Sequence, residues 1–290
     1  MSASPRTQGF RPVGFGLIEL MVAMVLGLLV VGAAFAIFQS NQRTFRANSG
    51  INRIQEGARV AFEMISNDVR AAGGSSCSNL ARPDVEHSNT SNETAFLTQP
   101  VSGNASEFTV VSGDDDAYPV TSATSNSVTV DLTQAQEDNP SFALSDAFSS
   151  GQSIIVCNAN QLYVVAVTGV STNTISFAPA TPVVMTNDPM APGASVMVSR
   201  FRNVRWFVNS GSLMVNRNDG NGPQRVIDNV AVMRVSYLQR GGLNFVAAPT
   251  VWSDVVAVRV NMRLNGADSA DGRTIRRDFS NIISLRSRVQ

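Results

Sequence analysis

The stretch FGLIELMVAMVLGLLVVGAAFAIF, residues 15–38, decides the fold of this chain. Its part from Leu20 to Phe38 is nineteen residues long and contains no charged or amide side chain. A helix rises about 1.5 Å per residue, so this run is long enough to cross the hydrocarbon layer of a bilayer, which is roughly 30 Å thick. The sequence therefore predicts one membrane-spanning helix near the start of the chain.

The residues in front of this stretch have the opposite character. The first fourteen, MSASPRTQGFRPVG, are polar and include Arg6 and Arg11 but no acidic residue. Basic residues beside a membrane helix favour the cytoplasmic side. We therefore expect residues 1–14 to be a cytoplasmic leader and the chain after the helix to be exported.

Glu19 is the anomaly of the apolar segment, because it opens a run that has no other charge. An ionised carboxylate inside a bilayer costs at least a few kcal/mol unless it has a partner. Either Glu19 lies at the membrane interface and reaches water, or it has an assigned partner within the membrane. Its position alone leaves both interpretations open.

The segment GFGLIEL, residues 14–20, resembles the processing site of type IV prepilins: a glycine, then phenylalanine, then glutamate as the fifth residue of the mature chain. The resemblance implies that a prepilin peptidase cuts after Gly14 and methylates the new amino terminus at Phe15. It also implies that Glu19 pairs with the terminal amine of a neighbouring subunit and sets subunit register. Gly16 departs from the family, which often has Thr or Ser there.

A different interpretation comes from Ala34-Phe35-Ala36, an A-x-A sequence after an apolar stretch, as at the end of a secretory signal peptide. The mature chain would then begin at Ile37, and an exported hydrolase would be the corresponding function. This interpretation leaves Glu19 without a purpose.

A second helical pattern follows the apolar run. Apolar residues recur every three or four positions, at Ile51, Ile54, Ala58, Phe62, Ile65, Val69 and Ala72. We expect the opposite, solvated face to carry Arg53, Glu56, Arg59, Glu63 and Asp68. Gly73-Gly74 predicts a left-handed C-cap, and Gly50 and Gly57 are weak points. One helix over about residues 15–72 is predicted, with its second half packed on a domain; a coiled-coil stalk is the alternative.

The segment RIQEGARVAFEMISNDVRAAG, residues 53–73, is similar to the part after the membrane helix in PilW-type minor pilins, which are related to J-type pseudopilins of type II secretion. VAVMRVSY at 230–237, WSDVVAVRVNMR at 252–263 and the final ISLRSR resemble that family's closing strands. These matches cover about a third of the chain. Residues 75–225 match nothing we can identify.

Residues 73–290 are predicted to form a β-rich domain. Residues 75–150 are poor in apolar side chains, so we expect loops and edge strands there, with short strands at 107–111 and 127–132. Further strands are expected at 153–157, 162–167, 174–177, 195–208, 225–227, 230–238 and 255–264. In the last one, Val256, Val258, Val260, Met262 and Leu264 share one face. The predicted fold class is α+β: a pilin helix (leader 1–14, membrane half 15–38, amphipathic half 39–72) packed on an antiparallel periplasmic domain.

Composition gives little support for catalysis or for binding nucleic acid. The formal net charge is zero, all basic residues are arginine, and the one histidine, His87, lies in the polar stretch EHSNTSNET. The absence of lysine excludes Schiff-base and Walker-type lysine chemistry. We therefore expect no enzyme activity and no cofactor. Arg200, Arg202 and Arg205 near Trp206 have the basic and aromatic mixture of single-strand binders, but a solvated strand edge explains them more simply.

Three further features concern covalent or metal sites. Cys77 and Cys157 suggest one disulfide in an exported domain, with two buried free thiols as the alternative. The acidic run Asp114-Asp115-Asp116 offers oxygen ligands for Ca²⁺, although a solvated turn is commoner. The expected metal content is therefore none, with this run as the weak candidate.

The resemblance to PilW-type minor pilins implies a minor pilin of a type IV pilus, in a priming or tip complex. Its expected partners are other minor pilins, the major pilin, prepilin peptidase and the inner-membrane assembly machinery. Its expected location is the inner membrane, with a cytoplasmic N-terminus, and then the pilus. The alternatives are a type II secretion pseudopilin, or a tip adhesin or DNA-uptake pilin that binds through residues 75–150.

Overall fold

The computed structural model describes residues 16–77, 82–83, 91–178, 195–268 and 274–288. The chain divides into two compact units, residues 1–52 with 267–275, and residues 53–266 with 276–290. The first contains the greater part of helix α1, and the second contains the β-rich domain with the last turns of that helix.

Helix α1 runs from Leu17 to Ala71 without a break at Gly50 or Gly57. It ends as the glycine pair predicted, because Gly73 has a φ of 66°, the left-handed conformation that favours glycine. The Gly74 N–H donates to the Ala71 carbonyl at 2.8 Å, and the Gly73 N–H donates to the Val111 carbonyl at 2.9 Å. The helix C-terminus is therefore fixed to the sheet as well as capped.

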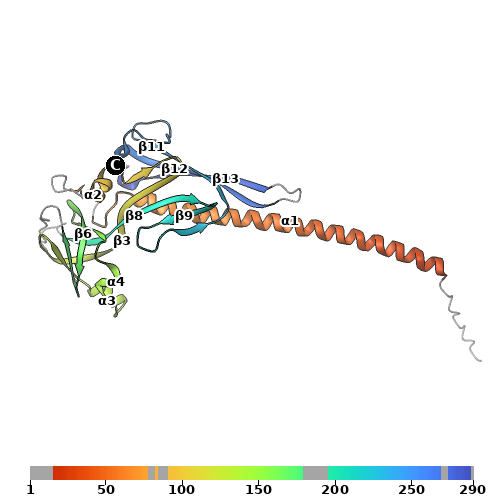
Figure 1. The fold of residues 1–290 in the computed structure, drawn as a ribbon, viewed down its shortest axis with the longest axis horizontal. Helices are drawn as coiled ribbons and strands as arrows, with labels where there is room; N and C mark the ends of the chain where they lie inside the picture. The colour runs from red at the N-terminus through yellow and green to blue at the C-terminus, as the bar shows by residue number, and fades with distance from the viewer. Residues whose placement is uncertain (1–15, 78–81, 84–90, 179–194, 269–273, 289–290) are drawn as a thin grey trace, which may run out of the picture. The chain divides into compact units, whose positions relative to one another are not determined.

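The larger sheet is assembled from strands between residues 82 and 227 (Figure 1). Its strands are β1 (Arg82–Pro83), β2 (Val101–Gly103), β3 (Glu107–Ala123), β4 (Ser127–Val130), β5 (Ser153–Cys157), β6 (Gln161–Val170), β7 (Thr174–Ala178), β8 (Met197–Asn209), β9 (Ser212–Asn216) and β10 (Gln224–Ile227). The order is β10-β9-β8-β5-β6-β7-β4-β3-β2, and β1 pairs with β6. The helices α2 (Ser91–Thr98), α3 (Thr133–Asp138) and α4 (Leu144–Ala147) lie in its connections.

This sheet closes on itself, because β3 pairs with β8 as well as with β4. The ring β3-β8-β5-β6-β7-β4 encloses its own apolar cluster, which includes Ile154, Val156, Val165, Phe177 and Val198. Leu144 and Phe148, from α4 and the residue after it, belong to the same cluster. The closed ring is therefore a second core, separate from the one that contains α1.

The smaller sheet has the order β11-β12-β13, with β11 at Val230–Gln239, β12 at Val255–Asp268 and β13 at Thr274–Ser284. Strands β11 and β12 are antiparallel. The short 3-10 helices η1 (Trp252–Asp254) and η2 (Arg286–Arg288) lie before β12 and after β13.

The main core joins the last turns of α1 to both sheets. Figure 1 shows the end of α1 between β8–β9 and β11–β12. Ile54, Ala58, Ile65, Val69 and Ala72 of the predicted stripe are buried in this cluster, and Phe62 packs against it. Trp206, Tyr237 and Met262 are among its largest fully buried side chains. The α+β class and the packing of the amphipathic helix stretch are thus confirmed.

Most predicted strands are present, and the strand at 153–157 is present with the predicted bounds. The expectation of loops and edge strands over residues 75–150 is wrong at β3, a seventeen-residue strand with neighbours on both sides. Its register shifts between Gly113 and Ala117, where the acidic run lies. Most of β13 was not predicted, because only its last two residues, Ile283 and Ser284, belong to the segment ISLRSR that resembles closing strands. In β12 four residues of the predicted apolar face are buried, namely Val258, Val260, Met262 and Leu264. The fifth, Val256, is not, because the register shifts beside it and Val255 is buried instead.

Candidate functional site

The first candidate site is the apolar part of α1. Between Leu17 and Phe38 its side chains are exposed and Glu19 is the one charged residue, in the first turn of the helix. By length and composition α1 is able to span a membrane. The Glu19 N–H donates to the Gly16 carbonyl at 3.0 Å, so Glu19 belongs to the helix from its first turn. Gly14 and Phe15, the predicted cleavage and methylation residues, lie outside the described residues.

The predicted disulfide is present. Cys77 Sγ bonds to Cys157 Sγ, which closes a sequence separation of 80 residues. Cys157 ends β5 and is fully buried, whereas Cys77 follows closely after the cap of α1. The bond therefore ties the chain leaving α1 to the closed ring of strands.

The arginines of β8 do not form the solvated edge that was expected. Each has an acidic partner from another element: Arg200 pairs with Asp114 of β3, Arg202 with Asp68 of α1, and Arg205 with Glu107 of β3. The Arg200 Nε to Asp114 Oδ2 distance is 2.8 Å. Arg205 also stacks on Phe207 at 4.8 Å from the ring centroid. These cations are matched within the fold, so they do not form a free basic patch.

Asp68 is the largest correction to the sequence analysis, because it was expected on the solvated face of the helix and is instead only 6% exposed. Trp206 Nε1 donates to its Oδ2 at 2.9 Å, and Arg202 donates to its Oδ1 at 3.1 Å. Burial raises the pKa of Asp68, and Arg202 and Trp206 act in the opposite direction. The carboxylate thus joins α1 to β8 at a cost in desolvation.

Other polar contacts also fix the last turns of α1. Asn281 Nδ2 of β13 donates to Ser66 Oγ at 3.2 Å. Ser287 Oγ, near the end of the described chain, donates to the Ala72 carbonyl at 2.6 Å. The helix end is therefore bonded to the larger sheet through Asp68, to strand β13 through Ser66, and to the 3-10 helix η2 through Ala72.

The acidic run at 114–116 does not form a cage of ligands. Arg200 binds Asp114 and lies 3.9 Å from Asp116. Within the described residues, no group of three His, Cys, Asp or Glu side chains is arranged to hold a metal ion. His87 lies outside those residues.

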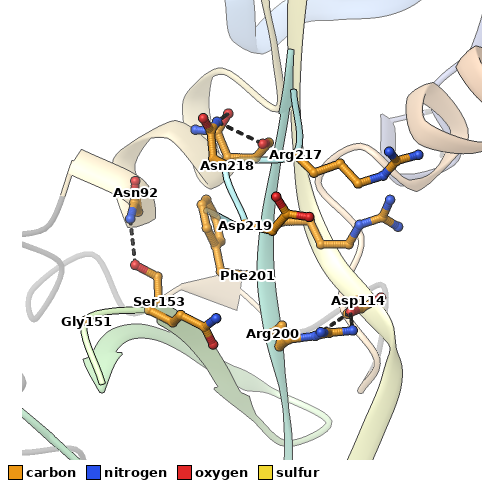
Figure 2. A pocket seen from close by; sticks show the side chains of 12 residues that line it. Asn92, Asp114, Gly151, Ser153, Arg200, Phe201, Arg217, Asn218 and Asp219 are labelled. Carbon is orange, nitrogen blue, oxygen red and sulfur yellow. Dashed lines mark hydrogen bonds and ion pairs between the residues drawn. The ribbon is translucent and has the colours of Figure 1, made fainter. Parts of the chain in front are cut away.

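A polar cleft of about 590 Å³ lies beside β8 (Figure 2). Side chains from α2, β3, β8 and the turn between β9 and β10 line it, together with the residues at the start of β5. Arg200, Arg217 and Asp219 supply charge, and Phe201 supplies an aromatic face. The sequence analysis missed this cleft, because its residues come from five separate parts of the chain.

Comparison with known proteins found no matching family model, no matching curated protein and no matching solved structure.

Proposed function

We propose that this chain is a minor pilin of the PilW type, which assembles through its N-terminal helix into a priming or tip complex of a type IV pilus. The observation that carries the proposal is the exposed apolar surface of residues 17–38 with Glu19 as its one charge. Water disfavours such a surface, so it needs lipid before assembly and neighbouring helices afterwards.

The domain gives the second support. The same helix that begins with this apolar segment ends with side chains in the core of a β-rich domain, bonded to both of its sheets. This is the arrangement that a subunit extracted from a membrane into a filament requires.

Glu19 has a defined task in this proposal. After cleavage behind Gly14 the new terminal amine of Phe15 is positive, and Glu19 of an adjacent subunit pairs with it. Opposite charges attract strongly in a low-dielectric filament core and are costly there when unpaired, so the pair selects one subunit register. Prepilin peptidase, the other minor pilins and the major pilin are the partners that this task implies.

Replacing Glu19 by alanine tests the proposal. The E19A chain should insert in the inner membrane at normal levels, because the substitution makes the segment more apolar. The number of surface pili should fall to the level of a strain that lacks this protein. Glu56→Ala is the matched control, since Glu56 is an exposed glutamate of the same helix outside the apolar segment. Normal piliation by E19A would contradict the proposal.

A type II secretion pseudopilin shares the helix and the proposed processing. The same E19A and E56A chains distinguish the two, because loss of protein secretion with normal piliation identifies the secretion system.

A further inference from the structure

The cleft beside β8 has no part in helix-driven assembly, and its position follows from the strand pairing. Strand β5 pairs with β8 as far as Arg200, which is opposite Ile154. Strand β9 pairs with the same edge of β8 from Arg205, which is opposite Asn216. Among the described residues, no strand lies beside Phe201–Val204 on this edge, so the two neighbouring strands separate and leave a hollow.

An added peptide strand does not suit this hollow. Asn218 Nδ2 donates to the Asn203 carbonyl at 3.0 Å and to Asn203 Oδ1 at 3.2 Å. The side chain of the β9–β10 turn therefore occupies the backbone acceptor that an incoming strand would need. A ligand of this cleft has to be recognised by side chains.

The charges of the cleft are balanced. Asp114 pairs with Arg200 and Asp68 pairs with Arg202. The Asn221 backbone N–H lowers the pKa of the Asp219 carboxyl, and the charge of Arg217 lowers it further, though more weakly. Asp219 is therefore ionised, and its charge offsets that of Arg217, the third arginine of the lining. The lining contains three arginines and two carboxylates, Asp114 and Asp219, and the remaining arginine, Arg202, is matched by Asp68, which is buried and is not a lining residue. No net field is left to attract an anion, so the cleft favours an uncharged ligand.

The remaining groups suit a hydroxylated ligand. Asn203 and Gln152 border the cleft, and in the described part of the chain their Nδ2 and Nε2 groups make no hydrogen bond. Amide and guanidinium groups are planar donors, and the carboxylates and amide oxygens are acceptors, which matches hydroxyls that both donate and accept. Phe201, half-buried, adds an aromatic face whose negative potential attracts the C–H bonds of a sugar ring.

We propose that this cleft is a binding site for a neutral oligosaccharide, bound by hydrogen bonds from the β8 and β9–β10 side chains and by stacking on Phe201. Its volume lies within the range of about 300–1,000 Å³ that is usual for small-molecule sites. This adds a recognition function to the exported domain that does not depend on how the helix assembles.

Affinity measurements on the full-length chain test the site. The chain is purified in a detergent without a sugar headgroup, since a sugar headgroup would compete. It is applied to immobilised neutral gluco-, galacto-, manno- and N-acetylglucosamine oligosaccharides, to sulfated and carboxylated forms of the same chains, and to an extended polypeptide. At least one neutral oligosaccharide should bind, with an affinity that does not change between low and high salt.

Two cleft variants with matched controls locate the site. Arg217→Gln and Phe201→Leu should each weaken neutral oligosaccharide binding by about tenfold. Arg225→Gln and Phe279→Leu make the same changes outside the cleft and should bind as the wild type does. Circular dichroism melting checks that each variant is folded, and all four should be piliated normally.

Several results would overturn the site. They are the absence of binding to every neutral oligosaccharide, salt-sensitive binding of the acidic forms alone, binding of the polypeptide alone, or folded R217Q and F201L chains that bind as tightly as the controls. None of these results bears on piliation, so the assembly proposal is tested separately.

Discussion

Trp206 Nε1 donates a 2.9 Å hydrogen bond to Asp68 Oδ2, across 138 residues of sequence. The bond joins the last turns of α1 to the centre of β8, within a core where Trp206 is fully buried. It is one of several hydrogen bonds that join α1 to the β-rich domain, together with those of Arg202 to Asp68 and of Asn281 to Ser66.

Removing the tryptophan donor should therefore be costly. Trp206→Phe leaves the buried Asp68 carboxylate with Arg202 alone, and we expect a loss of about 2–3 kcal/mol in the free energy of unfolding, as for a hydrogen bond to a charged group. Denaturant titration followed by circular dichroism on the full-length chain measures it.

Trp252→Phe is the control for this substitution. Trp252 is half-buried, and its ring meets Tyr237 edge-on at 5.0 Å without a carboxylate partner among the described residues. Its replacement should cost less than about 1 kcal/mol, since most of the apolar contact remains. Equal losses in the two variants would show that Asp68 gains nothing from Trp206.

The buried Asp68 also predicts a pH dependence. Its pKa is raised in the folded chain, chiefly by burial, so the folded state holds this proton more readily than the unfolded state does. The contribution of Asp68 to stability is then greatest below its ordinary pKa and falls as pH rises toward the raised value. The stability of the wild type relative to Asp68→Asn, measured from acidic to neutral pH, should decline with pH. A rising difference would mean that Arg202 outweighs burial.

Gly57 within α1 and Gly73 in the cap after it should respond to alanine with opposite signs. A Cβ at Gly57 would make an ordinary 3.5 Å contact with Ile227, so Gly57→Ala should stabilise the chain by up to about 1 kcal/mol. At Gly73 a Cβ would lie 3.0 Å from Pro100 Cβ, and φ is 66°, so Gly73→Ala should destabilise it by about 1–2 kcal/mol. Thermal melts of both variants check the signs. A stabilised G73A chain would refute the left-handed cap.

The Cys77–Cys157 bond should contribute about 2–5 kcal/mol, since it restricts a long loop of the unfolded chain. The Cys77→Ser/Cys157→Ser double variant should lose this amount and show no mobility shift on gels with reductant, whereas the wild type should shift. Alkylation of both wild-type thiols without reduction would contradict the bond.

Local features of the sequence were sufficient for part of the fold. The cap at Gly73 depends on one residue's conformational freedom, and strand β5 is a short apolar run, so both could be located in advance. The full length of β3 could not be predicted, because its register shifts at the acidic residues 114–116 and apolar and polar side chains do not alternate across that shift. That segment is held by β8, far along the chain, where Arg200 binds Asp114.

The same limit applies to the candidate sites. Asp68 was expected on the solvated face, although it follows Ile65 by three residues and precedes Ala72 by four, a helical spacing that puts it beside the apolar stripe. What could not be seen was its pair of donors, Arg202 and Trp206, which tertiary packing brings to it. The cleft beside β8 depends on where two strands separate, which is set by sheet topology and leaves no local pattern.

Mass spectrometry of the protein isolated from membranes identifies its mature amino terminus and so tests the proposed processing most directly. We predict that the wild-type chain begins with N-methylated Phe15 and that a Gly14→Ala chain keeps residues 1–14. A wild-type chain that begins at Ile37, or one that retains the leader, would contradict it.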